Sequence, residues 1–163
     1  MNPGLFSLAL LGVCVAHAAG GDRLAIAGVQ PDLFLILAVG ASLGATPEAG
    51  AGMGFLTGLY QDTLSGGPLG LRAFTLTLMA YAAARLTQSI QTSRPLAQFA
   101  LLLGGVVVAG AITLTTMGFF FGLPPLRQAF LHVLAPETLV TAGLGTALLA
   151  AGRAWRVARA HAV

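Results

Sequence analysis

Long apolar runs that open at prolines constrain this chain more than any other feature of its sequence. The runs cover residues 3–19, 31–46, 47–65, 68–88, 95–122 and 136–157. Proline is favoured in the first turn of a helix because its missing N–H has no partner there. The runs are continuously apolar, and most approach or exceed the length of about 20 residues that spans a bilayer. The pattern therefore predicts six helices.

Charged residues are too scarce for a water-soluble fold. They make up only 8% of the 163 residues, while 56% are apolar, and a soluble domain typically carries about 25% charged residues. We therefore expect an all-α integral membrane protein, with one membrane domain over residues 1–163, six transmembrane helices and no soluble domain. The runs at 31–46 and 47–65 are short, so these two helices are expected to be tilted or buried in the bundle.

The first run also resembles the core of a signal peptide, because Ala16-His17-Ala18 near its end has the form of a cleavage site. A signal peptide is expected to begin with a positively charged segment. Residues 1–4 contain neither lysine nor arginine. We therefore expect the run to be retained as the first transmembrane helix.

The arginines indicate how the helices cross the membrane. If both termini are cytoplasmic, five arginines face the cytoplasm and three face outward, which agrees with the positive-inside rule. We therefore expect a multi-pass protein with both termini in the cytoplasm. The cytoplasmic set is Arg85, Arg94, Arg153, Arg156 and Arg159, and the outer set is Arg23, Arg72 and Arg127.

The sequence disfavours several classes of function. Its net charge of +3 is small and spread out, so it offers no basic stripe for nucleic acid. Cys14 is the single cysteine and the three histidines lie on different segments, so neither a metal site nor a cofactor is expected. No nucleophile motif and no phosphate-binding loop occurs. We therefore expect a protein that is not an enzyme.

Among the five acidic residues, Asp62 has the least obvious structural role. Asp32, Glu48 and Glu137 each follow a proline, and a carboxylate in the first turn of a helix is stabilised by the helix dipole and by unpaired N–H groups. Asp62 lies near the C-terminal end of the run at 47–65, where the dipole disfavours an anion. We expect it to cap N–H groups of the following "SGGPLGLR" turn or to pair with Arg72. Contact with a partner or a ligand is the alternative.

Three glycines precede Asp62 at four-residue spacing and form one face of the same helix, here called the glycine stripe: Gly50, Gly54 and Gly58. Small residues at this spacing let helix backbones approach closely in lipid. The stripe could pack against another helix of this chain, or it could be a docking face for a helix of another protein. The sequence leaves both possibilities open.

The order of these motifs resembles the MreD family of rod shape-determining membrane proteins. The resemblance runs from "QPDLFLILAVG" through "GAGMGFLTGLYQDTLSGGPLGLRAFTLTLMAYAAARL" and is specific over about residues 31 to 86. Outside this segment the chain matches only as apolar helices. The family pattern falls on Gly54, Phe55, Gly58, Leu59, Asp62, Gly66, Pro68, Leu69 and Gly70.

The resemblance implies a component of the bacterial cell-elongation (rod) complex in the inner, cytoplasmic membrane, without enzymatic activity. It implies that the chain binds an MreC-like membrane protein and supports peptidoglycan synthesis and rod shape. Through that partner the chain would be linked to an MreB-like filament and to a RodA-like glycosyltransferase with its transpeptidase. The resemblance also implies a fold like that of the substrate-binding S-components of energy-coupling-factor transporters.

The residues expected to form the binding region lie at the start of the second helix and along the third and fourth. Whether they contact the partner or only shape the bundle is left open. An S-component-like small-molecule subunit of a transporter is the alternative function, and an intramembrane enzyme using Asp62 and His132 is a further one. The expected binding residues are Pro31, Asp32, Gly50, Gly54, Phe55, Gly58, Asp62, Gly70 and Arg72.

Overall fold

The computed structural model describes residues 3–20, 30–66, 69–89, 95–121 and 135–160, and these ranges hold six α-helices and no strand. The predicted all-α class is therefore confirmed for this part of the chain. The helices are α1 (Pro3–Gly20), α2 (Leu33–Ser42), α3 (Pro47–Ser65), α4 (Leu71–Ser89), α5 (Pro95–Phe121) and α7 (Ala135–Ala160).

The six helices correspond in order to the six predicted runs. Within the ranges given above, none of them combines the length and the apolar character that crossing a bilayer requires. The six transmembrane spans therefore stay a prediction.

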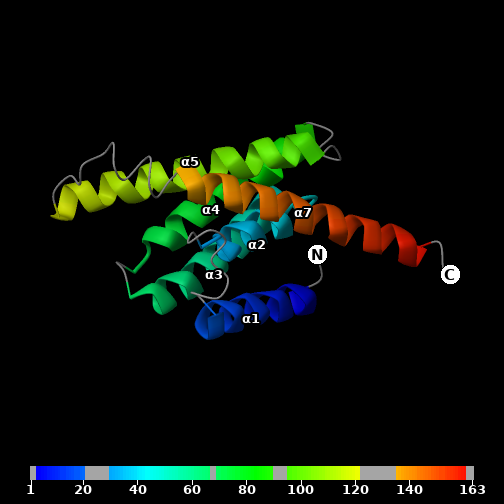
Figure 1. Ribbon diagram of the computed structural model, residues 1–163, viewed down its shortest axis with the longest axis horizontal. Helices are drawn as coiled ribbons and strands as arrows, with labels where there is room; N and C mark the ends of the chain where they lie inside the picture. Colours follow the sequence, from blue (N-terminus) through cyan, green and yellow to red (C-terminus); the bar gives the residue numbers. More distant parts are fainter. Residues whose placement is uncertain (1–2, 21–29, 67–68, 90–94, 122–134, 161–163) are drawn as a thin grey trace.

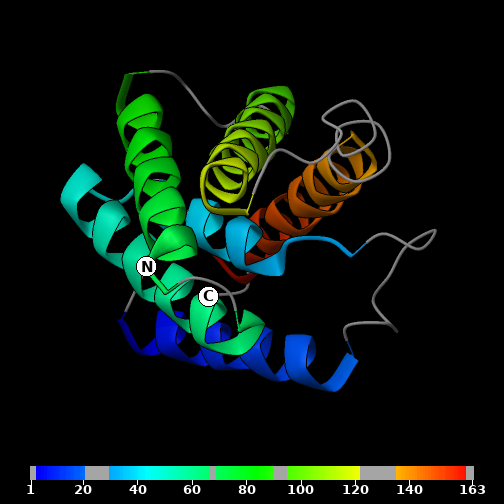
Figure 2. The ribbon, with the colours of Figure 1, turned by 90° about the vertical axis from the view of Figure 1, so that its left-hand side faces the viewer.

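The short helix α2 lies at the centre of the bundle. It contacts each of the other five described helices. Figure 2 shows α1 on one side of it, α5 on the opposite side, and α3 with α4 facing α7 across it. A helix that is apolar all round is a buried helix, and most of α2 is buried, including Phe34, Leu35 and Val39. The expectation that this helix lies inside the bundle is met.

The bounds of α2 differ from the predicted run at 31–46. The helix begins at Leu33 because Asp32 is its N-cap, whose Oδ1 accepts from the Leu35 N–H at 2.9 Å. It ends at Ser42 because Leu43 is extended and Gly44 has a φ of +80°. A left-handed residue is a common helix terminator, and glycine adopts it without strain.

Helices α3 and α4 form an antiparallel hairpin, seen in Figure 1 as two adjacent ribbons. Pro47 occupies the first turn of α3, as predicted, and Thr46 is the N-cap of this helix. Gly66 ends α3 in the left-handed conformation, with a φ of +64°. Helix α4 begins at Leu71, later than the predicted residue 68, directly after Gly70 with its φ of +97°. Pro68 lies outside the described residues.

The glycine stripe faces α4 of the same chain. A Cβ atom on Gly50 would lie 3.0 Å from the Ala80 carbonyl oxygen, and one on Gly54 would lie 2.7 Å from the Ala80 Cβ. On Gly58 it would lie 2.6 Å from the Ala73 nitrogen. Backbone atoms cannot move aside as a flexible side chain can. The stripe is therefore packed within the chain, which leaves its face unavailable to a helix of another protein.

Substitution of Gly58 by alanine should destabilise the bundle, because the new methyl group overlaps the backbone of α4. We expect Gly58→Ala to cost about 1–3 kcal/mol in free energy of unfolding. Gly52→Ala is the matched control, since a Cβ there meets no atom within 4 Å, and it should stabilise α3 by roughly 0.5–1 kcal/mol. Thermal unfolding in detergent measures both. Equal stabilities of the two variants would contradict the close approach of α3 and α4.

Candidate functional site

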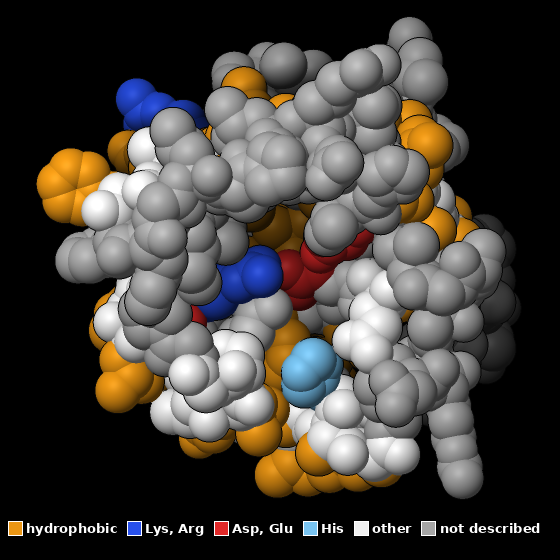
Figure 3. Space-filling model, turned by 60° about the vertical axis from the view of Figure 1, so that its left-hand side comes forward, with side chains coloured by type: hydrophobic (Ala, Val, Ile, Leu, Met, Phe, Trp, Pro, Cys, Tyr) orange, Lys and Arg blue, Asp and Glu red, His pale blue; other side chains and the backbone are white. Residues whose placement is uncertain are grey.

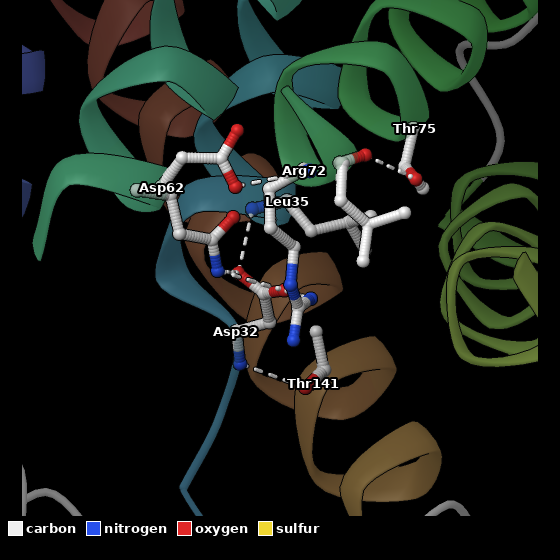
Figure 4. Close-up of polar contacts among 8 residues, drawn as sticks. Asp32, Leu35, Asp62, Arg72, Thr75 and Thr141 are labelled. Atoms are coloured by element: carbon white, nitrogen blue, oxygen red, sulfur yellow. Dashed lines mark hydrogen bonds and ion pairs between the residues drawn. The ribbon is translucent and has the colours of Figure 1, made fainter. Parts of the chain in front are cut away.

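Polar side chains from four helices gather at one end of the bundle. They come from the N-cap of α2, the last turns of α3, the first turn of α4 and the early part of α7 (Figure 4). Figure 3 shows basic and acidic side chains side by side in a hollow, with some hydrophobic side chains visible next to them. We call this group the polar cluster, and it consists of Asp32, Gln61, Asp62, Arg72, Glu137 and Thr141.

Asp32 links all four of these helices. Its side chain is only 7% exposed, and its Oδ2 forms an ion pair with Arg72 Nη1 at 3.3 Å. Gln61 Nε2 donates to its Oδ1 at 3.3 Å. The Asp32 N–H donates to Thr141 Oγ1 at 3.0 Å, which connects α2 to α7. Together with its bond to the Leu35 N–H, these contacts make Asp32 both a helix cap and a tie between helices.

Asp62 caps α4 from the end of α3. Its Oδ2 accepts from the Gly70 N–H at 2.8 Å and from the Ala73 N–H at 3.1 Å, and its Oδ1 accepts from the Arg72 N–H at 3.1 Å. The first N–H groups of a helix have no partner within that helix. A carboxylate that is 2% exposed therefore satisfies three donors at the positive end of the α4 dipole.

The sequence offered two structural partners for Asp62, and the structure distinguishes them. The expected capping of the N–H groups after the turn is confirmed. The guanidinium group of Arg72 pairs with Asp32 instead of Asp62, so direct charge pairing between Asp62 and Arg72 is wrong. The unfavourable position of Asp62 at the end of α3 is explained by its favourable position at the start of α4.

The other predicted binding residues separate into different environments. Pro31 is buried next to the polar cluster, and Gly70 lies in the exposed turn before α4. The glycine stripe lies between α3 and α4, as described above. Phe55 is 48% exposed on the outer face of α3. The structure therefore brings together Asp32, Asp62 and Arg72, but it does not bring Phe55 to them.

Sequence reasoning missed Thr141 as part of this site and gave Glu137 only a helix-start role. Glu137 lies close enough to Asp32 and Arg72 to interact electrostatically with both. Thr141 follows Glu137 by four residues, so the two share one face of α7. That spacing was the available signal, but a Thr in an apolar helix usually bonds its own backbone.

The polar cluster does not resemble a catalytic centre or a metal site. Both oxygens of Asp62 accept backbone N–H bonds, which leaves the carboxylate poorly placed as a base. Across the described ranges, no three or more His, Cys, Asp or Glu residues form a group that could hold a metal ion. His132, the other half of the enzyme alternative, lies outside these ranges. His17 packs its ring edge-on against Phe34 at 5.3 Å.

Comparison with known protein families shows which family this chain resembles. Residues 4–140 match the family described as rod shape-determining protein MreD. The chain belongs to the MreD family. No curated protein and no solved structure matched the chain.

Membership of the MreD family confirms the resemblance found in the sequence. MreD proteins are membrane proteins that act in rod shape determination, a structural role. The matched residues extend from α1 into the first turns of α7. They contain all the polar cluster except Thr141, which lies one residue beyond the match.

Removing the Asp62 carboxylate should destabilise this MreD protein more than removing an ordinary helix cap. Hydrogen bonds to a charged acceptor contribute about 1.5–3 kcal/mol, and Asp62→Ala removes the acceptor of three N–H donors, of which the Ala73 N–H is buried. The control is Thr46→Ala, which removes an exposed cap of α3 and should cost about 1 kcal/mol. Chemical or thermal unfolding in detergent compares the two. If Thr46→Ala proves the more damaging, the capping role of Asp62 is wrong.

Exchanging the charges of Asp62 and Arg72 should not restore what each single change removes. In Asp62→Arg with Arg72→Asp, the end of α3 no longer carries the carboxylate that accepts from the N–H groups of Gly70, Arg72 and Ala73. For Asp32 and Arg72 the opposite holds: we expect Asp32→Asn with Arg72→Met to be more stable than Arg72→Met alone, because the double variant leaves no unpaired buried charge. Unfolding of both sets of variants tests the assignment. If the Asp62/Arg72 double variant recovers stability and the Asp32/Arg72 double variant does not, Arg72 pairs with Asp62 and the assignment is wrong.

Proposed function

We propose that this chain spans the bacterial inner membrane with six helices and both termini in the cytoplasm. There it binds an MreC-like membrane protein as a non-enzymatic component of the rod complex and supports peptidoglycan synthesis. Through this partner it is linked to an MreB-like filament and to a RodA-like glycosyltransferase with its transpeptidase. The membership of the MreD family and the low content of charged residues support this proposal.

The partner-binding part of the proposal is based on α3, where residues of the MreD family pattern lie on both the inner and the outer face of the helix. Gly54, Gly58 and Asp62 face inward, and their contacts with α4 give each of them a structural role. Phe55 and Leu59 face outward and are 48% and 36% exposed. Bundle packing therefore explains the first group and does not explain the second.

The outer face of α3 has the composition of a helix-docking surface in lipid. Leu56 and Tyr60 lie beside Phe55 and Leu59 on this face and are 45% and 50% exposed. Gly52, one turn earlier, is also exposed, and a Cβ on it would touch nothing within 4 Å. Small residues beside large apolar ones allow a second helix to approach closely. A tyrosine also offers a hydroxyl group for a hydrogen bond across the interface.

The polar cluster supports this function indirectly. Asp62 fixes the start of α4 against the end of α3, and Asp32 ties both to α2 and α7. These contacts set the direction of α3, and they therefore set the orientation of its outer face. In this proposal the cluster is a positioning device for the partner-binding face. The transporter-subunit alternative gains no support from the comparisons.

Site-directed crosslinking in growing cells tests the proposed face. Cys14→Ala removes the single cysteine, after which a photoreactive group is placed at Phe55 or Leu59, with buried Thr57 as the control on the same helix. We expect adducts with an MreC-like protein from the two outer positions and none from Thr57. The proposal fails if the outer positions form no adduct while the variants still support rod shape.

A complementation experiment separates partner binding from exposure to lipid. We expect Phe55→Ala with Leu59→Ala to abolish rod shape while the protein still accumulates in the membrane. Leu8→Ala with Leu11→Ala is the matched control, because these residues of α1 are even more exposed, at 71% and 65%. Their loss should leave rod shape intact. Equal effects from the two double variants would contradict a specific role for the outer face of α3.

A further inference from the structure

The last two turns of α7 extend beyond the end of α2. Among the described helices, α7 packs against α2 and α5. Three pairs of neighbouring residues in α2 and α7 are each 109 positions apart, which shows that the two helices run parallel in a constant register. Because α2 ends at Ser42, this register places its end level with Ala151 of α7. The three pairs are Asp32 with Thr141, Ile36 with Gly145, and Gly40 with Leu149.

Helix α5 ends at the same level of α7. The two helices run antiparallel (Figure 1), and a Cβ atom on Gly145 would lie 2.7 Å from Leu102 Cδ1. Pro95, the first residue of α5, comes seven residues before Leu102, so it lies about level with Gly152, seven residues after Gly145. Helix α7 continues to Ala160, and Figure 1 shows its C-terminal end projecting past the other helices.

Three arginines on this projecting end continue the buried face of α7. We call them the basic face: Arg153, Arg156 and Arg159. Each follows a buried residue of α7 by eleven or eighteen positions, and these spacings are about three and about five helical turns, which return to the same line along the helix. The buried residues are, respectively, Ala142, Thr138 and Thr141. The face that packs within the bundle therefore becomes basic where the bundle ends.

The opposite face of α7 stays apolar to the end of the helix. Its last residues each follow an exposed residue by seven positions, or about two turns. They are Ala154, Trp155 and Ala158, which follow Ala147, Leu148 and Ala151. In a membrane-spanning bundle, lipid surrounds the outer side of a peripheral helix. Attraction to anionic headgroups alone would place arginines on that side, so their confinement to the other side favours a protein partner.

No acidic residue of the described helices lies beside the basic face. Residues 147–160 contain no acid. Three acids belong to the polar cluster at the opposite end of the bundle, and Glu48 lies in the first turn of α3, a helix that does not contact α7. The three arginines follow one another over about 9 Å of helix. A guanidinium group matches a carboxylate in a bidentate, charge-assisted pair, so the complementary surface is an acidic one.

We propose that the basic face binds an acidic segment of a partner protein beyond the ends of α2 and α5. The same face of α7 packs against helices of its own chain up to residue 151, and the partner segment continues this packing over the last two turns. The proposal rests on the proposed function for its location, since that function places the C-terminus in the cytoplasm. The partner segment is then a cytoplasmic one that lies next to the membrane.

Peptide binding to the purified full chain in detergent tests the proposal. Fluorescence anisotropy follows a labelled glutamate-rich peptide, with a glutamine-rich peptide of the same length as the control. The face-exchange variant moves the three positive charges to the opposite face of α7 and keeps the net charge. Its substitutions are Arg153→Gln, Arg156→Gln, Arg159→Gln, Ala151→Arg, Ala154→Arg and Ala158→Arg.

We expect the glutamate-rich peptide to bind the native chain about tenfold more tightly than the face-exchange variant, as the sum of three exposed ion pairs provides. On the opposite face the arginines lie against the detergent, which keeps the peptide from reaching all three together. The glutamine-rich peptide should bind neither protein. Equal affinities of the native chain and the variant for the glutamate-rich peptide would overturn the proposal.

Phosphatidylglycerol distinguishes a protein partner from a lipid surface. Native mass spectrometry compares its binding to the same two proteins, with phosphatidylcholine of the same acyl chains as the control. We expect phosphatidylglycerol to bind both proteins alike, because they carry the same charge at nearly the same depth. If this lipid distinguishes the two proteins and the glutamate-rich peptide does not, the basic face binds lipid and the proposal is wrong.

A single substitution keeps the test available if the face-exchange variant does not fold in thermal unfolding. Arg156→Gln removes the central charge of the basic face and should weaken binding of the glutamate-rich peptide about twofold. Arg85→Gln makes the same change of charge in α4 and should leave the affinity unaltered. Equal weakening by the two substitutions would show that only the net charge matters, which contradicts the proposal.

The proposed function and this proposal fail in different ways. If a reporter fused to the C-terminus lies outside the cytoplasm, the proposed crossing of the membrane is wrong, whereas peptide binding in detergent does not depend on the side. If Phe55 forms adducts with an MreC-like protein but the glutamate-rich peptide does not distinguish the face-exchange variant, the rod-complex function stands and the basic face has no acidic partner.

Discussion

The capping of α4 by the Asp62 carboxylate is the interaction on which the rest of this structure depends. The first N–H groups of a helix have no partner within that helix, and each one that is buried also loses water as a partner. Asp62 satisfies three of them across a turn that contains Gly66 and Gly70. Because the cap comes from α3, it also brings α3 close to α4, and the glycine stripe makes that approach possible.

The second carboxylate extends this hairpin to the rest of the bundle. Asp32 caps α2, pairs with Arg72 of α4 and receives a hydrogen bond from Gln61 of α3, while its N–H reaches Thr141 of α7. Its charge is thus held by donors from three helices, in a site where an isolated charge would be costly. The contacts of both carboxylates lie on the inner side of α3, while Phe55 and Leu59 on its outer face are exposed.

Local patterns predicted much of the fold, and long-range contacts could not be predicted in the same way. Proline alone placed the start of α3 at Pro47, and helix dipoles identified Asp62 as the acid that needed a partner. The ion pair between Asp32 and Arg72 joins residues forty positions apart, and no periodicity encodes it. Thr141 was missed for the same reason. The stripe of Gly50, Gly54 and Gly58 was visible, but only the position of α4 decided what it packs against.

Amide hydrogen exchange at the start of α4 tests the central claim most directly. Nuclear magnetic resonance of the protein in detergent, with and without Asp62→Ala, follows the N–H groups of Gly70, Arg72 and Ala73. These N–H groups donate to the carboxylate, so their exchange should be slow in the native protein and much faster in the variant. The first amides of α3 should change little. Unchanged protection of the three α4 amides would contradict the account.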